Sequence, residues 1–185
     1  SGININGVEH KILQYADDTV LTVQDVSSIE SAINQITEFT SVSGLNINIE
    51  KTEVLCLGRK PAKMKRYKLK TCSDHIRILG IVISPHKDIL INENYYNKLK
   101  KIEGILQMWQ QRDLTIYGKV LLVKALASSQ LIYSCSNTIS PPKDFFDKMN
   151  TILYKFLWNN KPDKIKRDIL KLPLDQGGVK MMDIE

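Results

Sequence analysis

Cysteine is scarce in this chain. Its three residues, Cys56, Cys72 and Cys135, are widely spaced and form neither a CxxC pair nor a zinc-ligand pattern. This spacing excludes a zinc module as the organising feature, and it favours reduced, mostly structural thiols in an intracellular protein.

Long hydrophobic runs are also lacking. The most apolar stretch, residues 121–133, is interrupted by Lys124 and is too short to cross a bilayer. Residues 1–15 contain neither the apolar run nor the cleavage site of a signal peptide. We therefore expect no membrane partner, and we interpret residues 121–133 as part of a core helix.

Acidic residues are fewer than basic ones. The 185 residues carry 26 Lys and Arg against 20 Asp and Glu, with a pI of about 9.1. The excess is uneven, since residues 1–91 hold 11 basic and 10 acidic side chains while residues 92–185 hold 15 and 10. Positive charge favours anionic partners, nucleic acid first, although a solubilising surface gives the same composition.

The first residues have strand and turn patterns. Alternating Ile and Asn before Gly7 predict a short strand that enters a hairpin turn, and residues 10–15 predict the returning strand. Asp17-Asp18 is expected to form the next turn, and residues 19–23 a further strand rich in β-branched side chains.

A helix is predicted next, followed by two more strands. Ser27 and Glu30 have the spacing of a capping box, and apolar residues then recur at helical intervals as far as Gly44, a plausible left-handed cap. Residues 45–50 have the alternation of a strand, and the apolar residues 54–57 predict a further strand that Gly58 stops.

Basic residues dominate the segment that follows. Residues 59–70 carry seven Lys and Arg and no acid, and Pro61 disfavours regular structure at its start. This segment either contacts nucleic acid or forms a solvated loop. An apolar strand pair is predicted at 76–83, and Pro85 stops it.

From about Asn92 the pattern is helical. Thr115 is a candidate cap for a second helix, Pro141-Pro142 opens a third, and Asn159-Asn160 ends it. The apolar positions are Tyr95, Leu99, Ile102, Leu106 and Trp109 in the first helix, Ile116, Val120, Val123, Ala127 and Leu131 in the second, and Phe146, Met149, Ile152 or Leu153, and Phe156 in the third.

The predicted fold class is therefore α+β. An antiparallel sheet with a packed helix is expected over residues 1–90, an all-helical module over 91–160, and a tail without strong periodicity over 161–185.

Asp17 and Asp18 are the most distinctive candidates for chemistry. Carboxylate oxygens are the ligands that hard divalent cations prefer, and two-metal phosphoryl transfer needs such ligands. Acidic residues are also common in hairpin turns for conformational reasons, and the pair alone does not decide between these interpretations.

Four segments together resemble one known family. Tyr15-Ala16-Asp17-Asp18 is similar to the aspartate-pair motif of reverse transcriptases, and residues 43–53 to the next palm motif, in which a lysine follows a Gly-led strand. Residues 78–81 resemble the hairpin that grips the primer end, and residues 173–185, with Gly177-Gly178, resemble a segment beyond the thumb of LINE-type elements. The order is the family's own, so the chain resembles the C-terminal palm plus thumb of a reverse transcriptase of non-LTR retrotransposons.

The resemblance implies an RNA-directed DNA polymerase, a nucleotidyltransferase that adds deoxynucleotides to a primer 3′-hydroxyl with Mg²⁺, or with Mn²⁺. Asp17 would bind the catalytic metal and Asp18 would assist. Tyr15 and Ala16 would lie close to the primer terminus. Lys51 would protonate the departing pyrophosphate, and its alternative is an ordinary exposed loop lysine.

The resemblance also assigns the later segments. Residues 1–90 would be the C-terminal part of the palm, 91–160 a thumb-like module that holds template and primer through phosphates, and 161–185 a post-thumb tail. Leu79 and Gly80 would support the primer grip, with a plain buried hairpin as the alternative. The candidate phosphate-binding side chains are Lys98, Lys101, Arg112 and Lys119.

A palm active site of this family also needs a third carboxylate on an earlier strand. The sole acid before Asp17 is Glu9, on the strand that leads directly into the hairpin. We therefore expect a fragment that is inactive in isolation and needs the N-terminal half of the polymerase, with RNA template, DNA primer and deoxynucleoside triphosphates as its other partners. The alternatives are a non-catalytic nucleic-acid-binding remnant of a retrotransposon and a fragment of an RNA-dependent RNA polymerase, although Ala16 fits a reverse transcriptase better.

Two further expectations follow. The family works as a ribonucleoprotein in cytoplasm and nucleus, which is the implied localisation. Strands near residues 10–23 would expose edges and an apolar face without the rest of a palm, so we predict self-association.

Overall fold

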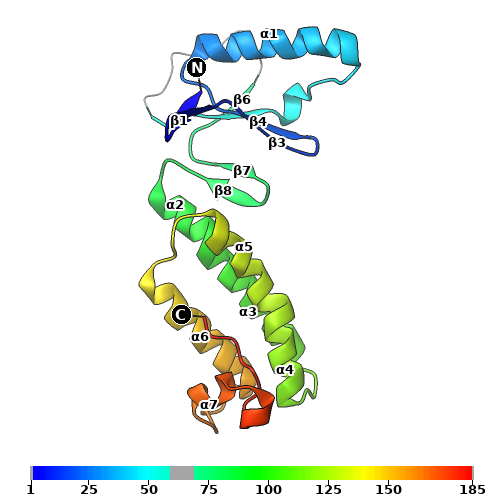
Figure 1. Ribbon diagram of the computed structural model, residues 1–185. Coiled ribbons are helices and arrows are strands. Elements are labelled where there is room, and N and C mark those ends of the chain that lie inside the picture. Colours follow the sequence, from blue (N-terminus) through cyan, green and yellow to red (C-terminus); the bar gives the residue numbers. More distant parts are fainter. Residues whose placement is uncertain (1, 59–68, 185) are drawn as a thin grey trace. The chain divides into compact units, whose positions relative to one another are not determined.

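The chain divides into two compact units, Ser1–Ser73 and Asp74–Glu185. The computed structural model describes residues 2–58 and 69–184 (Figure 1). The basic segment predicted at 59–70 lies outside the described residues except for its last two positions. Each unit is described by itself.

The described strands of the first unit form three two-stranded ladders. Two of them are antiparallel hairpins and the third is parallel. They pair β1 (Ile3–Ile5) with β2 (Val8–His10), β3 (Ile12–Tyr15) with β4 (Asp18–Leu21), and β5 (Glu53–Leu55) with β6 (Lys70–Cys72). The α+β class is as predicted, but the described strands form separate ladders rather than one sheet.

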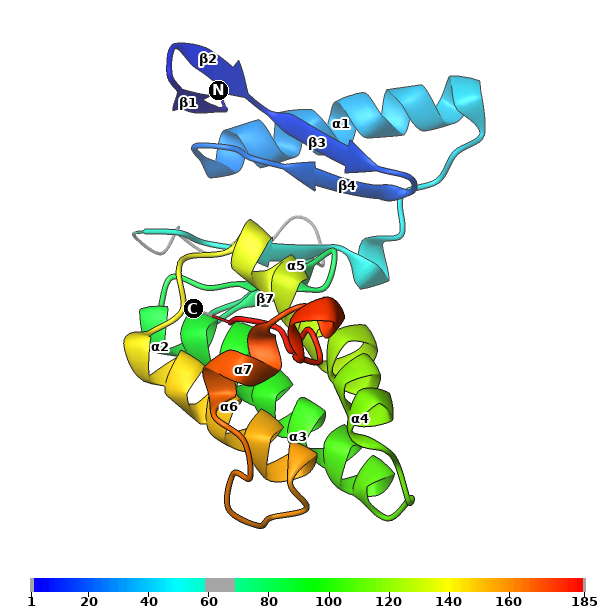
Figure 2. The ribbon, with the colours of Figure 1, turned by 60° about the horizontal axis from the view of Figure 1, so that its bottom comes forward.

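Helix α1, Val26–Ser43, runs alongside the β3–β4 hairpin in two views (Figure 1, Figure 2). The predicted cap at Ser27 is wrong, because Asp25 is the N-cap and its side chain accepts a hydrogen bond from the Ser28 backbone N–H. The predicted end is confirmed, since Gly44 adopts a left-handed conformation with φ 74°. Only Ile33 of this helix is buried.

The predicted strand at residues 45–50 is also wrong. The last residues of this segment instead form part of a 3₁₀ turn, η1, Ile49–Lys51. The Asn48 side chain accepts from the Lys51 backbone N–H at 3.1 Å, and the Thr52 hydroxyl donates to the Asn48 carbonyl at 2.7 Å. Such local bonds by Asn and Thr compete with a strand ladder.

The second unit begins with a hairpin and continues as helices. The predicted hairpin at 76–83 is confirmed as β7 (Ile76–Ile78) and β8 (Ile81–Ile83). The helices are α2 (Lys87–Ile91), the π-helical turn η2 (Asn92–Tyr96), α3 (Asn97–Gln110), α4 (Ile116–Leu122), the π-helical turn η3 (Val123–Ser128), α5 (Ser129–Asn137), α6 (Lys143–Leu157), α7 (Arg167–Lys171) and the 3₁₀ turn η4 (Leu174–Gln176).

The three predicted helical stripes meet in one core. The stripes of the first two helices are buried as predicted except at Trp109 and Ile116, which are partly buried. Thr115 caps α4 by accepting from the Gly118 backbone N–H. In α6 the buried aromatic residue at the start is Phe145, and Phe146 is only partly buried. Asn159 and Asn160, with φ of 52° and 57°, end α6 as predicted.

The tail folds back on this core. The backbone N–H groups of Val179 and Met181 both donate to the Leu170 carbonyl, at 3.2 and 2.8 Å. Met181 is buried, and Gly177 has a left-handed φ of 81° at the end of η4. The Gly-Gly segment thus allows the chain to return against α7.

The compact units and the predicted functional domains divide the chain at different places. The β7–β8 hairpin belongs by its contacts to the helical unit, whereas the predicted first domain runs to residue 90. The functional division into 1–90, 91–160 and 161–185 stays a prediction. None of the helices within residues 2–58 and 69–184 has the length and apolar character needed to span a bilayer.

Candidate functional site

The aspartate pair lies at the tip of the β3–β4 hairpin. Tyr15 pairs with Asp18 across the ladder, so the two turn residues are Ala16 and Asp17, and Asp18 opens β4. The sequence placed both aspartates in the turn. Ala16 has φ 53°, a left-handed conformation that a residue with a Cβ adopts rarely and at a cost in strain.

The tip of this hairpin is accessible to solvent. Asp17 and Asp18 are exposed, and Tyr15 is 69% exposed. Adjacent accessible carboxylates are suitable oxygen donors for a divalent cation, so the residue types fit magnesium. Within the described residues, however, no group of three His, Cys, Asp or Glu side chains comes together. The two carboxylates are therefore fewer ligands than a divalent cation takes.

Glu9, the one acid upstream of the pair, has local partners. Its carboxylate accepts from the Gly2 backbone N–H at 2.6 Å and pairs with Lys11 at 2.9 Å. The hydrogen bond from Gly2 and then the one from Lys11 lower the pKa of Glu9. These contacts are those of a strand residue within its own hairpin.

Lys51 lies in η1, in the same unit as the aspartates, and is exposed. Its backbone N–H donates to the Asn48 side chain at 3.1 Å. Among the described residues no hydrogen bond or ion pair joins Lys51 to Asp17 or Asp18. The structure thus leaves both its assigned role and the alternative of a plain loop lysine as predictions.

The tip of the β7–β8 hairpin has two residues with positive φ. Leu79 has φ 48° and Gly80 has φ 81°, the combination of a type I′ turn. Leu79 is 42% exposed, whereas Ile81 and Val82 are buried. The Tyr133 hydroxyl of α5 donates to the Leu79 carbonyl at 2.7 Å, so the helices hold this exposed tip.

The four candidate phosphate-binding residues lie in different environments. Lys101 is exposed, and exposed Arg112 stacks over the Trp109 ring at 4.7 Å. Lys98 is partly buried, and its ammonium group donates to the Ser134 hydroxyl. Burial is the main cause that lowers the pKa of Lys98, and the nearby charges of Arg77 and Lys101 add to it.

Lys119 is buried inside the helical unit. Its ammonium group donates to the carbonyls of Phe156 and Leu157, both at 3.2 Å, and to the Asn159 side chain. Burial lowers the pKa of this lysine. These bonds satisfy the carbonyls at the end of α6, where a positive charge also matches the helix dipole. In this fold, therefore, Lys119 serves as a helix cap.

Sequence reasoning missed Asn94. This residue is fully buried, and its side chain binds the backbone of β8 and of α2. The only sequence signal is a polar residue directly before Tyr95, the first residue of the apolar stripe.

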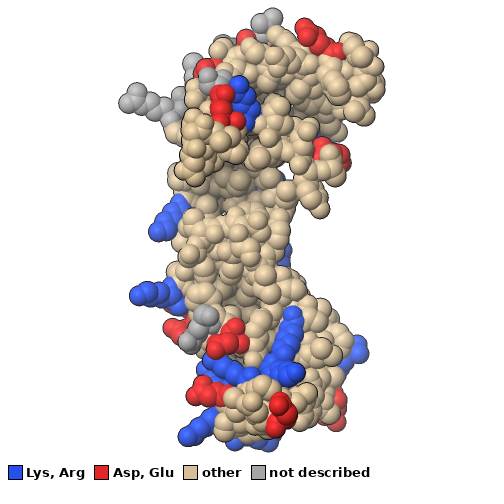
Figure 3. Space-filling view, in the orientation of Figure 1, with Lys and Arg blue, Asp and Glu red and all other residues tan. Residues whose placement is uncertain are grey.

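Charge on the helical unit is mixed rather than uniformly positive. In Figure 3, Lys and Arg side chains lie among Asp and Glu side chains over the lower part of the face shown. Several are paired, as in Lys148 with Asp144 and Arg167 with Asp163. A count of basic residues therefore does not identify the phosphate contacts. Of the four candidate residues, exposed Lys101 and Arg112 are the better ones.

Parts of this chain are similar to known proteins. Residues 3–83 match the family model of reverse transcriptase, described as an RNA-dependent DNA polymerase. The uncharacterized 149 kDa protein of transposon TX1 from Xenopus laevis is 26% identical over 169 residues, which cover 89% of this chain and 13% of that protein. A putative ribonuclease H protein from Arabidopsis thaliana is 26% identical over 95 residues, covering 48% of this chain and 15% of that protein. The chain thus spans less than a sixth of either relative.

Proposed function

Because this chain is a relative of the reverse transcriptases of non-LTR retrotransposons, we propose that it is part of an RNA-directed DNA polymerase. The observation that carries the proposal is the β3–β4 hairpin, which presents two adjacent accessible carboxylates inside the segment that matches the family. Its substrates would be deoxynucleoside triphosphates and a DNA primer on an RNA template.

Asp17 and Asp18 would hold Mg²⁺, with Mn²⁺ as a substitute. The metal supplies activation of the primer 3′-hydroxyl and charge neutralisation at the phosphates when it is bound. Since the described residues bring no third carboxylate to the pair, a further acidic ligand has to come from another segment of the polymerase. The chain by itself is then expected not to extend a primer.

The other residues would act on the nucleic acid and the triphosphate. Lys51 would contact the triphosphate, and Leu79-Gly80 would contact the primer end. The helical unit would act as a thumb, with Lys101 and Arg112 as its accessible phosphate contacts. The polymerase would work as a ribonucleoprotein in cytoplasm and nucleus.

The test is primer extension with Mg²⁺ on an RNA template. The assay uses the chain alone, the chain mixed with the preceding segment of the polymerase, and the same mixture with Asp17→Asn/Asp18→Asn. We expect extension only in the mixture with intact aspartates. Glu38→Gln is the matched control, since it removes an exposed acid of α1 in the same unit, outside the hairpin and outside residues 43–53.

Two results would contradict the proposal. Extension by the chain alone, lost in the double variant, would mean that a complete site forms within this chain. Absence of extension in the mixture, together with salt-dependent duplex binding, would favour the non-catalytic binding remnant.

A further inference from the structure

Neither outer edge of the β7–β8 hairpin is covered by another strand among the described residues. Ile78 and Ile81 close the two-residue turn, so the next pair, Arg77 and Val82, is the one whose N–H and C=O groups point away from the partner strand. The backbone of Val82 therefore needs a partner outside the hairpin, and Val82 is buried where water is excluded.

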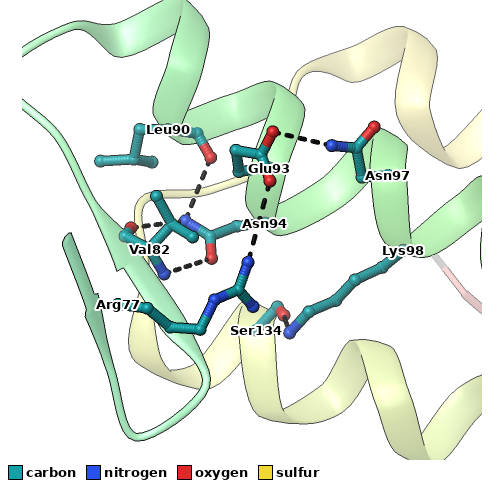
Figure 4. Close-up of polar contacts among 8 residues, drawn as sticks. All are labelled: Arg77, Val82, Leu90, Glu93, Asn94, Asn97, Lys98 and Ser134. Carbon is teal, nitrogen blue, oxygen red and sulfur yellow. Dashed lines mark hydrogen bonds and ion pairs between the residues drawn. The ribbon is translucent and has the colours of Figure 1, made fainter. Parts of the chain in front are cut away.

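Asn94 supplies that partner (Figure 4). The Val82 N–H donates to Asn94 Oδ1 at 2.9 Å, and Asn94 Nδ2 donates to the Val82 carbonyl at 2.7 Å. A carboxamide has the same donor and acceptor as a peptide group, so the Asn94 side chain pairs with Val82 as a neighbouring strand would. With 0% of its surface exposed, Asn94 would be costly to bury without these bonds.

The π-helical turn η2 helps to place this side chain. Asn94 lies within this turn, where the backbone bonds run to the carbonyl five residues back. Its Nδ2 also donates to the Leu90 carbonyl of α2 at 3.1 Å. The carboxamide is thus fixed from two sides, by its own helix and by β8.

Two further contacts hold the same hairpin to the helices. The Tyr133 hydroxyl binds the Leu79 carbonyl at the tip, and Arg77 pairs with Glu93 at 3.9 Å (Figure 4). Leu79 is in the left-handed region, so its conformation persists only where the surroundings fix it. These contacts fix the hairpin at its edge, its tip and its first strand.

We propose that Asn94 is a positioning residue that fixes the β7–β8 hairpin to the helical unit, so that Leu79-Gly80 is presented in one orientation as part of that unit. The partner that would use this orientation is the 3′ end of a nucleic-acid primer, and this second part rests on the proposed function. Asn94 itself touches no substrate and acts through Val82.

The first experiment measures hydrogen exchange of the native 185-residue chain and of Asn94→Leu by mass spectrometry. Leu fills a similar volume and removes all three hydrogen bonds. We expect peptides from residues 76–83 to exchange about tenfold faster in the variant, while peptides from α3 and α6 stay within about twofold. Equal acceleration of all peptides, or an unchanged hairpin, would overturn the proposal.

Two more variants keep the test decisive if Asn94→Leu does not fold. Asn94→Asp retains the acceptor for the Val82 N–H and loses the two donated bonds at neutral pH, so the hairpin should still exchange faster than in the native chain. Ile102→Val is the matched control, because it shortens a buried α3 side chain far along the helix from Asn94. It should accelerate helical peptides at least as much as hairpin peptides.

The second experiment tests the partner. A primer–template duplex with a photoreactive terminal base is crosslinked to the native chain and to Asn94→Asp. The native chain should crosslink within residues 76–83, and the variant should lose about threefold or more of that yield at unchanged duplex affinity. If hydrogen exchange shows that Asn94 protects the hairpin but residues 76–83 never crosslink, the positioning role of Asn94 stands and the proposed primer contact is wrong.

Discussion

Gly178 lies where the tail turns back onto α7, and its lack of a side chain is a structural requirement. A Cβ at this position would overlap the Leu172 carbonyl and lie 2.7 Å from the Ile169 carbonyl oxygen. Because the atoms around this position belong to the backbone, none of them can move aside as a flexible side chain would.

We predict that Gly178→Ala lowers the free energy of unfolding of the helical unit by about 2–3 kcal/mol. Urea unfolding followed by tryptophan fluorescence measures this change, because both tryptophans, Trp109 and Trp158, lie in that unit. Gly104→Ala in α3 is the control, since a Cβ there meets nothing within 4 Å. Gly104→Ala should raise the free energy of unfolding by about 0.5–1 kcal/mol, because alanine has a higher helix propensity than glycine. A loss in both variants would contradict the steric argument.

Tyr154 and Tyr95 are buried tyrosines, and loss of the hydroxyl group should change the free energy of unfolding in opposite directions. Within the described residues the Tyr154 hydroxyl has no hydrogen-bond partner, whereas the Tyr95 hydroxyl binds Thr138 at 2.6 Å and the Ile139 carbonyl at 2.5 Å. Tyr154→Phe should therefore add about 0.5–1 kcal/mol to the free energy of unfolding at neutral pH, and Tyr95→Phe should remove about 1–2 kcal/mol.

The same two residues predict how stability changes at alkaline pH. Burial raises the pKa of both hydroxyls above the ordinary value of 10.0. The folded state therefore holds these protons more tightly than the unfolded state, so stability is present below pH 10 and is lost as pH rises through the folded pKa. Tyr154→Phe should reduce this loss in urea titrations between pH 9 and about 11. An unchanged alkaline slope would count against a buried, protonated Tyr154.

At the scale of elements, the N-terminus of α1 depends on Asp25. Its carboxylate accepts from the Ser27 hydroxyl and the Ser28 backbone N–H, both at 2.7 Å, and these bonds lower its pKa. Because the folded pKa is below the ordinary value of 3.8, the cap contributes stability above that value and loses it as pH falls through the folded pKa.

Asp25→Ala should therefore destabilise α1 at neutral pH, and the difference from the native chain should vanish in acid. Circular dichroism of thermal unfolding at pH 7 and near pH 2 measures both effects. Ser27→Ala is the control, because Ser27 donates to the cap rather than forming it, and it should have the smaller effect. If Ser27→Ala were the more damaging change, the cap predicted from the sequence would be the true one.

The elements that could be predicted from the sequence are those whose pattern is long. The stripe from Tyr95 to Trp109 repeats at helical spacing over four turns, and all of it except the partly buried Trp109 is buried as expected. Residues 45–50 show strand alternation over only six positions, and the side chain of Asn48 overrides it with a local turn. Strand β6 has no pattern of its own and exists through its parallel pairing with β5. Short segments are decided by partners that sequence spacing does not reveal.

The candidate site could be predicted only in part, for the same reason. The motif Tyr15–Asp18 identified the hairpin, because a turn between paired strands is local in sequence. A count of basic residues did not separate Lys101, which is exposed, from Lys119, which caps α6. Asn94 was missed because its partner Val82 lies twelve residues away. Burial and long-range pairing, and not residue type, decide these roles.

At the scale of the whole molecule, the first unit exposes apolar side chains on both faces of one hairpin. Ile12 and Leu13 are neighbours on β3 and so point to opposite faces, and they are 59% and 56% exposed. Phe39 of α1 is 60% exposed as well. A two-stranded ladder with two open edges and two apolar faces is a surface for further chains.

We predict that the chain self-associates through this unit at micromolar concentration. Sedimentation velocity should show species larger than a monomer, and added sulfate should strengthen the association because apolar burial drives it. Association through charge would instead weaken with salt. Ile12→Thr/Leu13→Thr places a β-branched residue of high strand propensity at both positions and should shift the distribution toward monomer. Leu121→Gln is the control, since it removes one exposed apolar side chain from α4 in the other unit, and it should leave the distribution unchanged. A monodisperse monomer that unfolds in one cooperative transition would show that the exposed faces are tolerated. It would also remove the physical reason to expect that a further segment of the proposed polymerase covers them.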